Sequence, residues 1–580
     1  MKKLLRITLL LVLVNVVAVH AQTGSHRITP GELESMPEYL RLISNYQQSG
    51  ITTPPSSAVR ASAEWEEIDA LMITWTTYAS ILKEIVRYAQ TETQVLIVCS
   101  DSNAVISYLN SNSVPLTNVH YIIAPFNSVW SRDYGQWNIY TNDVDSLALI
   151  DWIYNRPRPK DDTVPAAIAN YTGLPLYQTT TAPNDLIHTG GNFMTDGFGT
   201  GFSSNLILTD NPGKTPAQID TIMSQFMGIS RYIRMTTLPY DVIHHIDMHI
   251  KLLDEETLLV GEYPAGVADG PQIEANLQYI LNNYNSVFGT PYKVVRIPMP
   301  ADGSGNYPDQ GGDYRTYTNA VFVNKTVILP GYAQQYDTTA VRIWQEAMPG
   351  YRIVTIPCNN IITALGAIHC ITKEVSAVDP LLISHQPLHD TYNSTNPYQV
   401  DARILHRSGI ASANLYYRTD TLLPYQSAAM TLTAAASNTW TGFIPAQPGG
   451  TVVYYYVEGT SVSGKTQVRP LPAPQGYWKF KVLLNVGIDG NANLEITSLG
   501  NAYPNPSKGI TCIPVVSGET GDCKLSLKDI LGRTVDVVFE GTINEGEKKF
   551  FVQTSGLASG VYVIDLLING KRFTQPLIVR

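Results

Sequence analysis

Residues 81–99 read ILKEIVRYAQTETQVLIVC, and this stretch contains the two elements that decide the fold class. Its first part, Ile81–Ala89, spaces apolar side chains three and four positions apart, as an amphipathic helix does. Its last part, Gln94–Cys99, is a short run rich in β-branched and other apolar residues, which is typical of a strand. The stretch therefore predicts a helix followed by a strand, the unit from which α/β folds are built.

The same alternation of short strands and amphipathic helices extends along the chain on both sides of this stretch. The later segments that show it most clearly are Val105–Leu109, Tyr121–Ala124, Val321–Leu329, Ala340–Ala347 and Arg352–Ile356. We therefore expect one α/β domain, large enough to be catalytic, over residues 61–378.

The pattern changes near residue 380. Residues 379–485 contain short alternating strands such as Val452–Val457, separated by turn residues, and no helical spacing. About 100 residues of this kind predict an Ig-like β-sandwich. A linker is expected over 486–499, and short strands over 500–580 predict a second, smaller β-sandwich.

The beginning of the chain has the pattern of a secretory signal peptide. A positively charged start, Met1–Arg6, precedes the apolar run Leu9–Val19, and a small residue, Ala21, lies where cleavage is expected. A membrane anchor is the alternative, but the apolar run is short for a bilayer span. We expect a signal peptide over 1–21, an N-terminal leader over 22–60 and no transmembrane segment in the mature chain.

The composition excludes several classes of protein. Apolar residues make up 44% of the 580 residues, which excludes a disordered chain. The formal net charge is −10 and no basic stripe is present, so a nucleic-acid partner is not expected. Five cysteines are too few for a disulfide scaffold. Charged residues are only 15%, a level that favours an exported, β-rich protein.

Five clusters of polar residues interrupt the apolar sequence in the α/β region. They are Trp130–Gly135, Asp151–Pro159, Thr189–Gly199, His244–His249 and Gly366–Thr372. Taken singly, each has an ordinary structural explanation as an ion pair, a turn or a small core cysteine. The His-x-Asp pattern also lacks the His and Cys spacing of a zinc site.

Taken in order, the clusters resemble the guanidine-modifying deiminases of the pentein fold. The order is Trp-x-Arg-Asp, Gly-Gly-Asn with Asp-Gly, His-x-Asp and a late His-Cys, and Glu64–Glu66 extends the resemblance over roughly residues 60–375. The nearest branches are the agmatine deiminases and the Porphyromonas-type peptidylarginine deiminases. The resemblance implies a five-bladed α/β propeller with a central active site.

The resemblance implies catalytic roles for Cys370, His245, Asp133 and Asp247. The two carboxylates would bind the planar guanidinium through its N–H edges. Cys370 would attack the guanidinium carbon, and the cationic substrate would lower the pKa of its thiol. Loss of ammonia would leave a covalent thiouronium, which water hydrolyses, and His245 would carry the protons.

Two further histidines are predicted to be structural. His244 and His369 adjoin catalytic candidates, and alternate side chains of a strand face opposite ways, so His369 should point away from the partners of Cys370. We find no calcium-type acidic cluster, and expect neither a metal nor a cofactor.

The candidate substrate-binding residues are Arg156, Arg158, Trp130, Gly191 and Asn192. A peptide that ends in arginine has an α-carboxylate, which an arginine fork would bind, whereas agmatine has none. The segment around Arg156 and Arg158 resembles the carboxylate-binding segment of the bacterial peptidylarginine deiminases, and Arg156 is the better candidate. A solvated basic loop is the alternative.

Other features divide between the two branches. Thr189 and export favour the peptidyl branch, whereas Gly366–Thr372 resembles both branches, and Tyr240 is displaced from the tyrosine of the peptidyl branch. We therefore expect a secreted deiminase that converts peptidyl arginine, at a peptide C-terminus, to citrulline and ammonia. The alternatives are an agmatine deiminase that yields N-carbamoylputrescine, and a catalytically inactive surface adhesin.

The last 80 residues resemble the C-terminal sorting domain of type IX secretion substrates. The resemblance rests on Asn501–Pro506, Leu531–Arg533 and Gly560–Tyr562. It implies that the type IX secretion machinery is a partner and that the protein is released or attached to the outer cell surface. Cys512 and Cys523 lie in this domain and either pair or stay reduced.

Overall fold

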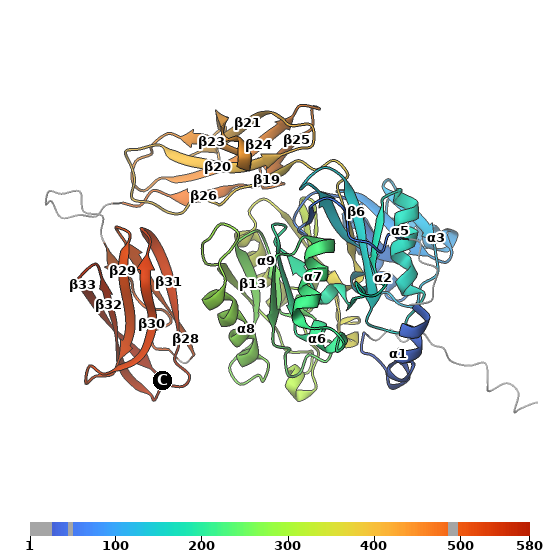
Figure 1. The fold of residues 1–580 in the computed structure, drawn as a ribbon, viewed down its shortest axis with the longest axis horizontal. Helices are drawn as coiled ribbons and strands as arrows, with labels where there is room; N and C mark the ends of the chain where they lie inside the picture. The colour runs from blue at the N-terminus through green and yellow to red at the C-terminus, as the bar shows by residue number, and fades with distance from the viewer. Residues whose placement is uncertain (1–25, 44–49, 485–496, 508) are drawn as a thin grey trace, which may run out of the picture. The chain divides into compact units, whose positions relative to one another are not determined.

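The computed structural model (Figure 1) describes residues 26–43, 50–484, 497–507 and 509–580. The chain divides into two compact units, one ending at Leu484 and the other beginning at Asn485. The expected signal peptide, 1–21, lies outside the described residues, as does most of the expected linker, 486–499.

Residues 59–376 form five small mixed sheets. Each sheet contains an antiparallel pair of strands and at least one strand added in parallel. The strands, sheet by sheet, are β1 (Val59–Ala61), β5 (Trp137–Thr141), β6 (Leu147–Tyr154), β7 (Leu176–Thr179) and β8 (Ile187–His188); β9 (Met194–Thr195), β10 (Thr200–Ser204) and β11 (Arg231–Met235); β12 (Ile250–Leu252), β13 (Thr257–Glu262) and β14 (Lys293–Pro298); β15 (Val321–Val323), β16 (Thr326–Gly331) and β17 (Arg352–Pro357); and β18 (Lys373–Ser376), β2 (Ile68–Thr74), β3 (Gln94–Cys99) and β4 (Val119–Ile123).

A helix connects the parallel strands of each sheet, and Figure 1 shows α5 and α8 at the outer edges of this region. The helices of the first unit are α1 (Pro30–Ile43), α2 (Ala79–Ala89), α3 (Ser102–Ser111), α4 (Ser131–Tyr134), α5 (Val164–Thr172), α6 (Leu206–Asp210), α7 (Pro216–Met227), α8 (Gly270–Asn283) and α9 (Gln334–Ala347). The helix and strand expected within residues 81–99 are confirmed as α2 and β3.

Local sequence explains where these helices begin and end. The apolar stripe of α2 is buried, as its spacing predicts. At α7, Thr215 and Gln218 form a reciprocal capping box, which satisfies backbone N–H groups of the first turn. The helix ends at Gly228, whose φ of 70° lies in the left-handed region that glycine adopts without strain.

The last strand of the α/β region joins a sheet formed much earlier in the chain. β18 pairs antiparallel with β2, so the chain returns to the sheet of β2, β3 and β4 after passing through the other four. This pairing closes the set of sheets around a common apolar core. It also brings the segment around Glu64 next to the segment around Cys370, more than 300 residues later.

An all-β module follows in the same compact unit. Its strands are β19 (Leu382–Ser384), β20 (Tyr398–Leu405), β21 (Ile410–Arg418), β22 (Gln426–Ala434), β23 (Thr439–Ile444), β24 (Val452–Ser461), β25 (Thr466–Arg469) and β26 (Trp478–Lys481). They form one continuous, near-barrel sheet rather than the two separate sheets that a sandwich predicts. Lys465 pairs with Glu67 at 2.6 Å, so the module contacts the α/β region.

The second unit contains two antiparallel sheets. Its strands are β27 (Ser498–Leu499), β28 (Ile510–Ser517) and β31 (Gly546–Gln553) in one sheet, and β30 (Thr534–Ile543), β29 (Gly521–Lys528), β32 (Gly560–Ile568) and β33 (Lys571–Val579) in the other. Cys512 on β28 and Cys523 on β29 therefore lie in different sheets.

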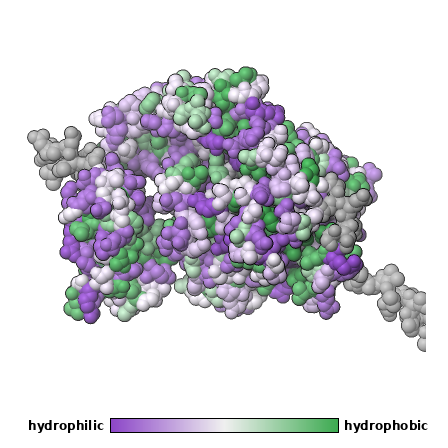
Figure 2. Space-filling model, viewed as in Figure 1, coloured by the Kyte–Doolittle hydropathy of each residue, from purple (hydrophilic) through white to green (hydrophobic). Residues whose placement is uncertain are grey.

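None of the described helices is long and apolar enough to span a membrane. On the face of the first unit drawn in Figure 2, hydrophilic residues are interspersed with apolar ones. Large apolar side chains are buried instead in the cores between sheets and helices, among them Trp130, Trp137 and Trp344.

Candidate active site

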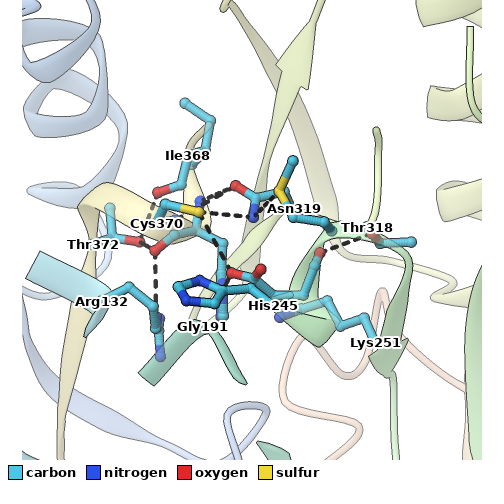
Figure 3. Close-up of polar contacts among 12 residues, drawn as sticks. Arg132, Gly191, His245, Lys251, Thr318, Asn319, Ile368, Cys370 and Thr372 are labelled. Atoms are coloured by element: carbon cyan, nitrogen blue, oxygen red, sulfur yellow. Dashed lines mark hydrogen bonds and ion pairs between the residues drawn. The ribbon is translucent and has the colours of Figure 1, made fainter. Parts of the chain in front are cut away.

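The candidate site residues come from short segments that directly precede a strand paired antiparallel in its sheet. Cys370 lies three residues before β18, Asp247 three before β12, Gly191 three before β9 and Asp133 four before β5. The repeated sheets thus deliver one segment each to the same place. Figure 3 shows these segments converging around the Cys370 sulfur.

Cys370 is fully buried in a 3₁₀ turn, His369–Ile371. Asn319 donates from Nδ2 to its sulfur at 3.1 Å, and the Asp247 carboxylate lies 3.5 Å from that sulfur. Burial, and after it the charges of Asp247 and Asp133, raise the pKa of the thiol well above its ordinary value. The thiol is therefore protonated in this structure.

His369 points toward the partners of Cys370, which corrects the sequence expectation. Its Nδ1 lies 2.8 Å from Asp247 Oδ2 and its Nε2 lies 2.9 Å from Glu64 Oε1. Both ring nitrogens face carboxylates, so both donate and the ring is an imidazolium. The strand alternation does not apply because residues 369–371 form a turn rather than a strand.

A buried ionic network around Glu64 supports this histidine. Glu64 also accepts from Lys251 at 2.6 Å. Arg132 forms ion pairs with both Glu64 and Glu374, and its distance to Glu374 is 2.8 Å. Burial alone would raise the pKa of Glu64, but the surrounding cations, His369 first, hold it well below its ordinary value. Glu64 is therefore ionised and fixes the orientation of the His369 ring.

His245 and Asp133 lie on the other side of the site. His245 Nδ1 is 3.5 Å from Asp133 Oδ1, and the Gly191 N–H donates to the same oxygen at 3.1 Å. Burial lowers the pKa of His245 to about 4, although Asp133 partly opposes the shift. The neutral ring is ready to accept a proton. A Cβ at residue 191 would lie 2.4 Å from His245 Nδ1, so only glycine fits there.

A residue that the sequence did not single out occupies this side of the site. His26, from the N-terminal leader, is fully buried and contacts Asp133 through Nε2. Its ring stacks on Trp130, with the centroids 4.2 Å apart and the planes 5° apart. Its Nδ1 lies 2.9 Å from the carbonyl oxygen of Leu365. Trp130 and Asp133, both predicted to bind substrate or take part in catalysis, thus hold His26.

The arginines predicted to bind a carboxylate are both buried, which contradicts the alternative of a solvated basic loop. Arg156 is 7% exposed and Arg158 is 4% exposed. Arg158 donates from Nε to Glu32 Oε1 at 2.7 Å, and Arg156 lies with Nε 3.5 Å from the His26 carbonyl oxygen. Both arginines therefore face the N-terminal segment.

Two further residues of the predicted clusters face the neighbouring backbone. Asn192 Oδ1 accepts from the Ser204 N–H at 2.8 Å, which ties the Gly-Gly-Asn turn to β10. The His244 carbonyl oxygen accepts from the Ser204 hydroxyl at 2.7 Å. The backbone φ of His244, 58°, marks a tight turn before His245. A substrate-binding role for Asn192 stays a prediction.

The sequence reasoning missed Asn319 as a contact of the nucleophile. Besides its bond to the sulfur, Asn319 Oδ1 accepts from the His369 N–H at 3.1 Å. It lies two residues before β15, an offset close to that of Asp247, which lies three residues before β12. That repeated offset is the signal that could have found it.

His26, Asp133 and His245 lie close enough together to hold a metal ion, with their ligand atoms within 4.8 Å of one another. His26 Nε2, however, already contacts the Asp133 carboxylate as a hydrogen-bond donor. The hydrogen-bonded arrangement therefore accounts for this cluster without an ion.

Comparison with known proteins decides the family. The model of the Porphyromonas-type peptidyl-arginine deiminases matches residues 60–375, more than half of the chain. The chain belongs to this family. It is therefore a guanidino-group deiminase by family, acting on guanidino C–N bonds. The model of the secretion system C-terminal sorting domain matches residues 501–580, which indicates secretion or attachment to the outer surface.

Individual relatives cover the α/β region. A Vibrio parahaemolyticus protein named "Putative agmatine deiminase" is 26% identical over 378 residues, covering 56% of this chain and 99% of its own length. A Mycoplasma capricolum protein of the same name is 22% identical, covering 56% and 97%.

Similar solved structures cover the same part of the chain. An X-ray structure titled as a putative agmatine deiminase is 18% identical with a TM-score of 0.50, covering 57% of this chain and all of its own. A putative arginine deiminase from Porphyromonas gingivalis has a TM-score of 0.49 at 20% identity, covering 55% and 98%. With the five mixed sheets, the family match confirms the expected pentein-like α/β fold.

Proposed function

We propose that the protein hydrolyses the guanidinium group of arginine at the C-terminus of a peptide, giving citrulline and ammonia. The observation that carries this proposal is the pair of buried arginines, Arg156 and Arg158, beside the Asp133 side of the site. A guanidinium fork binds a carboxylate bidentately. A C-terminal arginine has an α-carboxylate to bind there, whereas agmatine has none.

In this proposal the substrate guanidinium lies between Asp133 and Asp247, with its plane against Trp130. The carboxylates accept from its N–H edges and fix its orientation toward the Cys370 sulfur. The positive charge also offsets the two carboxylates that raise the pKa of the thiol. The Cys370 thiolate is therefore favoured only while a guanidinium is bound.

The first half of the reaction forms the covalent intermediate. Cys370 passes its proton to neutral His245, and the thiolate adds to the guanidinium carbon to give a neutral tetrahedral adduct. His245 returns the proton to the departing amino group, and ammonia leaves as the carbon–nitrogen bond breaks. The product of this half is a positively charged thiouronium on Cys370.

The second half consumes water. His245 takes a proton from water, and the hydroxide adds to the thiouronium carbon. The new adduct collapses to the ureido product, the carbon–sulfur bond breaks, and the sulfur takes up the hydroxyl proton. The proton left on His245 leaves with ammonia as ammonium. Asn319 supports the sulfur throughout, through the bond from its Nδ2.

A second candidate is agmatine deimination to N-carbamoylputrescine. The relatives from Vibrio parahaemolyticus and Mycoplasma capricolum carry that name, at 26% and 22% identity. The same four catalytic residues would serve this reaction, because the guanidinium is the same.

The deciding experiment compares three substrates with residues 22–580: a peptide ending in arginine, the same peptide amidated, and agmatine. We expect turnover of the free-acid peptide to exceed that of the amide at least tenfold in kcat/KM. Arg158→Ala should bring this ratio close to one, because a charge-assisted hydrogen bond contributes about 1.5–3 kcal/mol. We compare the ratio of the two kcat/KM values because Glu32, which also binds Arg158, affects the kcat/KM of both peptides equally.

The matched control is Arg342→Ala, since Arg342 is an exposed arginine on α9. It should leave the ratio unchanged. Preference for agmatine would contradict the proposal and favour the second candidate. Turnover of none of the three would favour a non-catalytic surface protein.

We also infer the remaining domain assignments from the sequence. The leader spans 22–60, the catalytic domain 61–378, the all-β module 379–485, a linker 486–499 and the sorting domain 500–580. Limited proteolysis tests them, with cleavage expected first in the linker.

A further inference from the structure

The N-terminal segment, residues 26–43, inserts into the site although the proposed mechanism does not use it. We propose that this segment is an intramolecular pseudosubstrate, which holds the deiminase closed until it is displaced or removed. The proposal rests on the proposed function for what it blocks, but its contacts stand independently of the substrate.

The first observation is that His26 presents a planar cation to the guanidinium subsite. Nε2 faces the Asp133 carboxylate and Nδ1 faces the Leu365 carbonyl oxygen, at 2.9 Å. Neither acceptor can donate, so both ring nitrogens carry protons and the ring is positively charged. The cation lies flat against Trp130, and it is fully buried.

These features match what a guanidinium needs. It is also planar and positively charged, and it donates from its edges to carboxylate and carbonyl oxygens. A substrate cannot reach Asp133 and Trp130 while His26 fills the space between them. The His26 N–H also donates to the Ala364 carbonyl oxygen at 3.0 Å, which fixes the segment against the turn that precedes Cys370.

The second observation is that Glu32 presents a carboxylate to Arg158. Glu32 Oε1 accepts from Arg158 Nε at 2.7 Å, and Glu32 Oε2 accepts from the Thr29 N–H at 2.8 Å. Burial alone would raise the pKa of Glu32, but Arg158 and Thr29 lower it below its ordinary value. The segment thus offers a cation at one end and a carboxylate at the other, as a C-terminal arginine would.

The third observation is that the segment is attached through its own small apolar cluster. Tyr39 and Ile43 of α1 pack against Ile153, with Met36 and Leu40 beside them, and this cluster is separate from the main core of the five sheets. The segment can therefore leave without opening that core. The five sheets then stay intact, and only the site changes.

The test uses the full chain, residues 22–580, with His26→Ala and a matched control, His120→Ala. His120 is a partly buried histidine on β4, outside the site. An internal ligand that competes with the substrate lowers the fraction of molecules whose site is open, and the apparent KM rises by the same factor. We expect His26→Ala to lower KM for the turned-over substrate at least tenfold with kcat unchanged, and His120→Ala to change neither.

A second readout does not depend on the substrate. 2-Chloroacetamidine is a planar cation that the site can attract, and the Cys370 sulfur displaces its chloride to form a thioether. Mass spectrometry follows labelling at Cys370, and buried Cys358 reports on the integrity of the fold. We expect His26→Ala and Glu32→Gln to accelerate labelling of Cys370 at least tenfold and threefold, with Cys358 unlabelled.

The outcomes separate the two proposals. Faster labelling without turnover of any arginine substrate would support the pseudosubstrate and overturn the proposed function. Unchanged labelling and unchanged KM in His26→Ala would overturn the pseudosubstrate. A lower kcat at unchanged KM would also overturn it, because His26 would then belong to the catalytic machinery.

Discussion

The two carboxylates of the site differ in the origin of the histidine that each one contacts. Asp247 contacts His369, whose other nitrogen faces Glu64, while Asp133 contacts His26, whose other nitrogen faces a backbone carbonyl. Each ring is therefore an imidazolium between two acceptors. His369 belongs to the closed set of sheets, whereas His26 belongs to a separately attached segment.

This difference determines which of the two carboxylates is available to the cationic group of a substrate. Asp247 keeps its imidazolium, because His369 is held by Glu64 and by its N–H bond to Asn319. Asp133 can exchange its imidazolium for a substrate. One carboxylate is thus permanently oriented, and the other is the point of exchange.

The largest expected effect comes from neutralising these carboxylates one at a time. Asp247→Asn and Asp133→Asn should each lower kcat/KM about 10³-fold, because truncating one partner of a buried charge pair costs about 2–5 kcal/mol. Asp247→Asn should also lower the free energy of unfolding, by about 3 kcal/mol, since it leaves the buried imidazolium of His369 with one partner. Steady-state kinetics and urea unfolding measure both quantities.

The control for this comparison is the His26→Ala background. There, Asp133→Asn should not lower stability, because no imidazolium from the segment is left without its partner. A stability loss equal to that of Asp247→Asn in this background would contradict the distinction between a permanent and an exchangeable partner.

The next effect concerns His245, the one histidine of the three that is neutral. Burial lowers its pKa from an ordinary 6.5 to about 4. A group whose pKa is depressed on folding contributes stability that is present above pH 6.5 and lost as the pH falls toward 4. At about 1.4 kcal/mol per pH unit, the loss over this window is about 3 kcal/mol.

The measurement is the difference in unfolding free energy between the protein and His245→Asn at pH 7, 5.5 and 4. The difference is needed because burial raises the pKa of Asp161 to about 6 and of Asp241 to about 7, which stabilises the fold in acid. Those contributions cancel between the two proteins. A difference independent of pH would mean that folding does not shift the pKa of His245.

A smaller effect is expected from crowding the Asp133 side. In Gly191→Ala the new Cβ would lie 2.4 Å from His245 Nδ1 and 3.0 Å from Asp133 Oδ1. A displacement of this size costs about 10²-fold in rate, so kcat should fall by about that factor. Gly213→Ala is the matched control, because a Cβ there meets nothing within 4 Å. Equal kinetics in both variants would contradict the tight packing of this side.

Much of the fold and part of the site could be predicted from the sequence. The apolar spacing of residues 81–99 places α2 and β3, since that spacing is local. Cys370, His245 and Asp247 come together because each precedes a strand paired antiparallel in one of the repeated sheets. The repeat itself is visible only as an alternation of helices and strands, so the offset that also places Asn319 was missed.

The rest depends on contacts that no local pattern encodes. The orientation of His369 follows from a 3₁₀ turn of three residues, where strand alternation fails. His26 meets Asp133 across 107 positions of sequence, from a leader without any motif. A lone histidine near a chain end is indistinguishable from a surface residue until the fold brings its acceptors together.

The smallest expected effect tests how the exchangeable partner is held. Tyr39 is 4% exposed and lies in the small cluster that attaches α1, whereas Leu33, on the same helix, is 62% exposed. Tyr39→Ala should weaken the attachment without touching the site, so KM should fall about threefold while kcat and the main unfolding transition stay unchanged. Leu33→Ala should change none of these. If Tyr39→Ala instead lowers the main transition, the segment is part of the core, and Asp133 has a partner as permanent as that of Asp247.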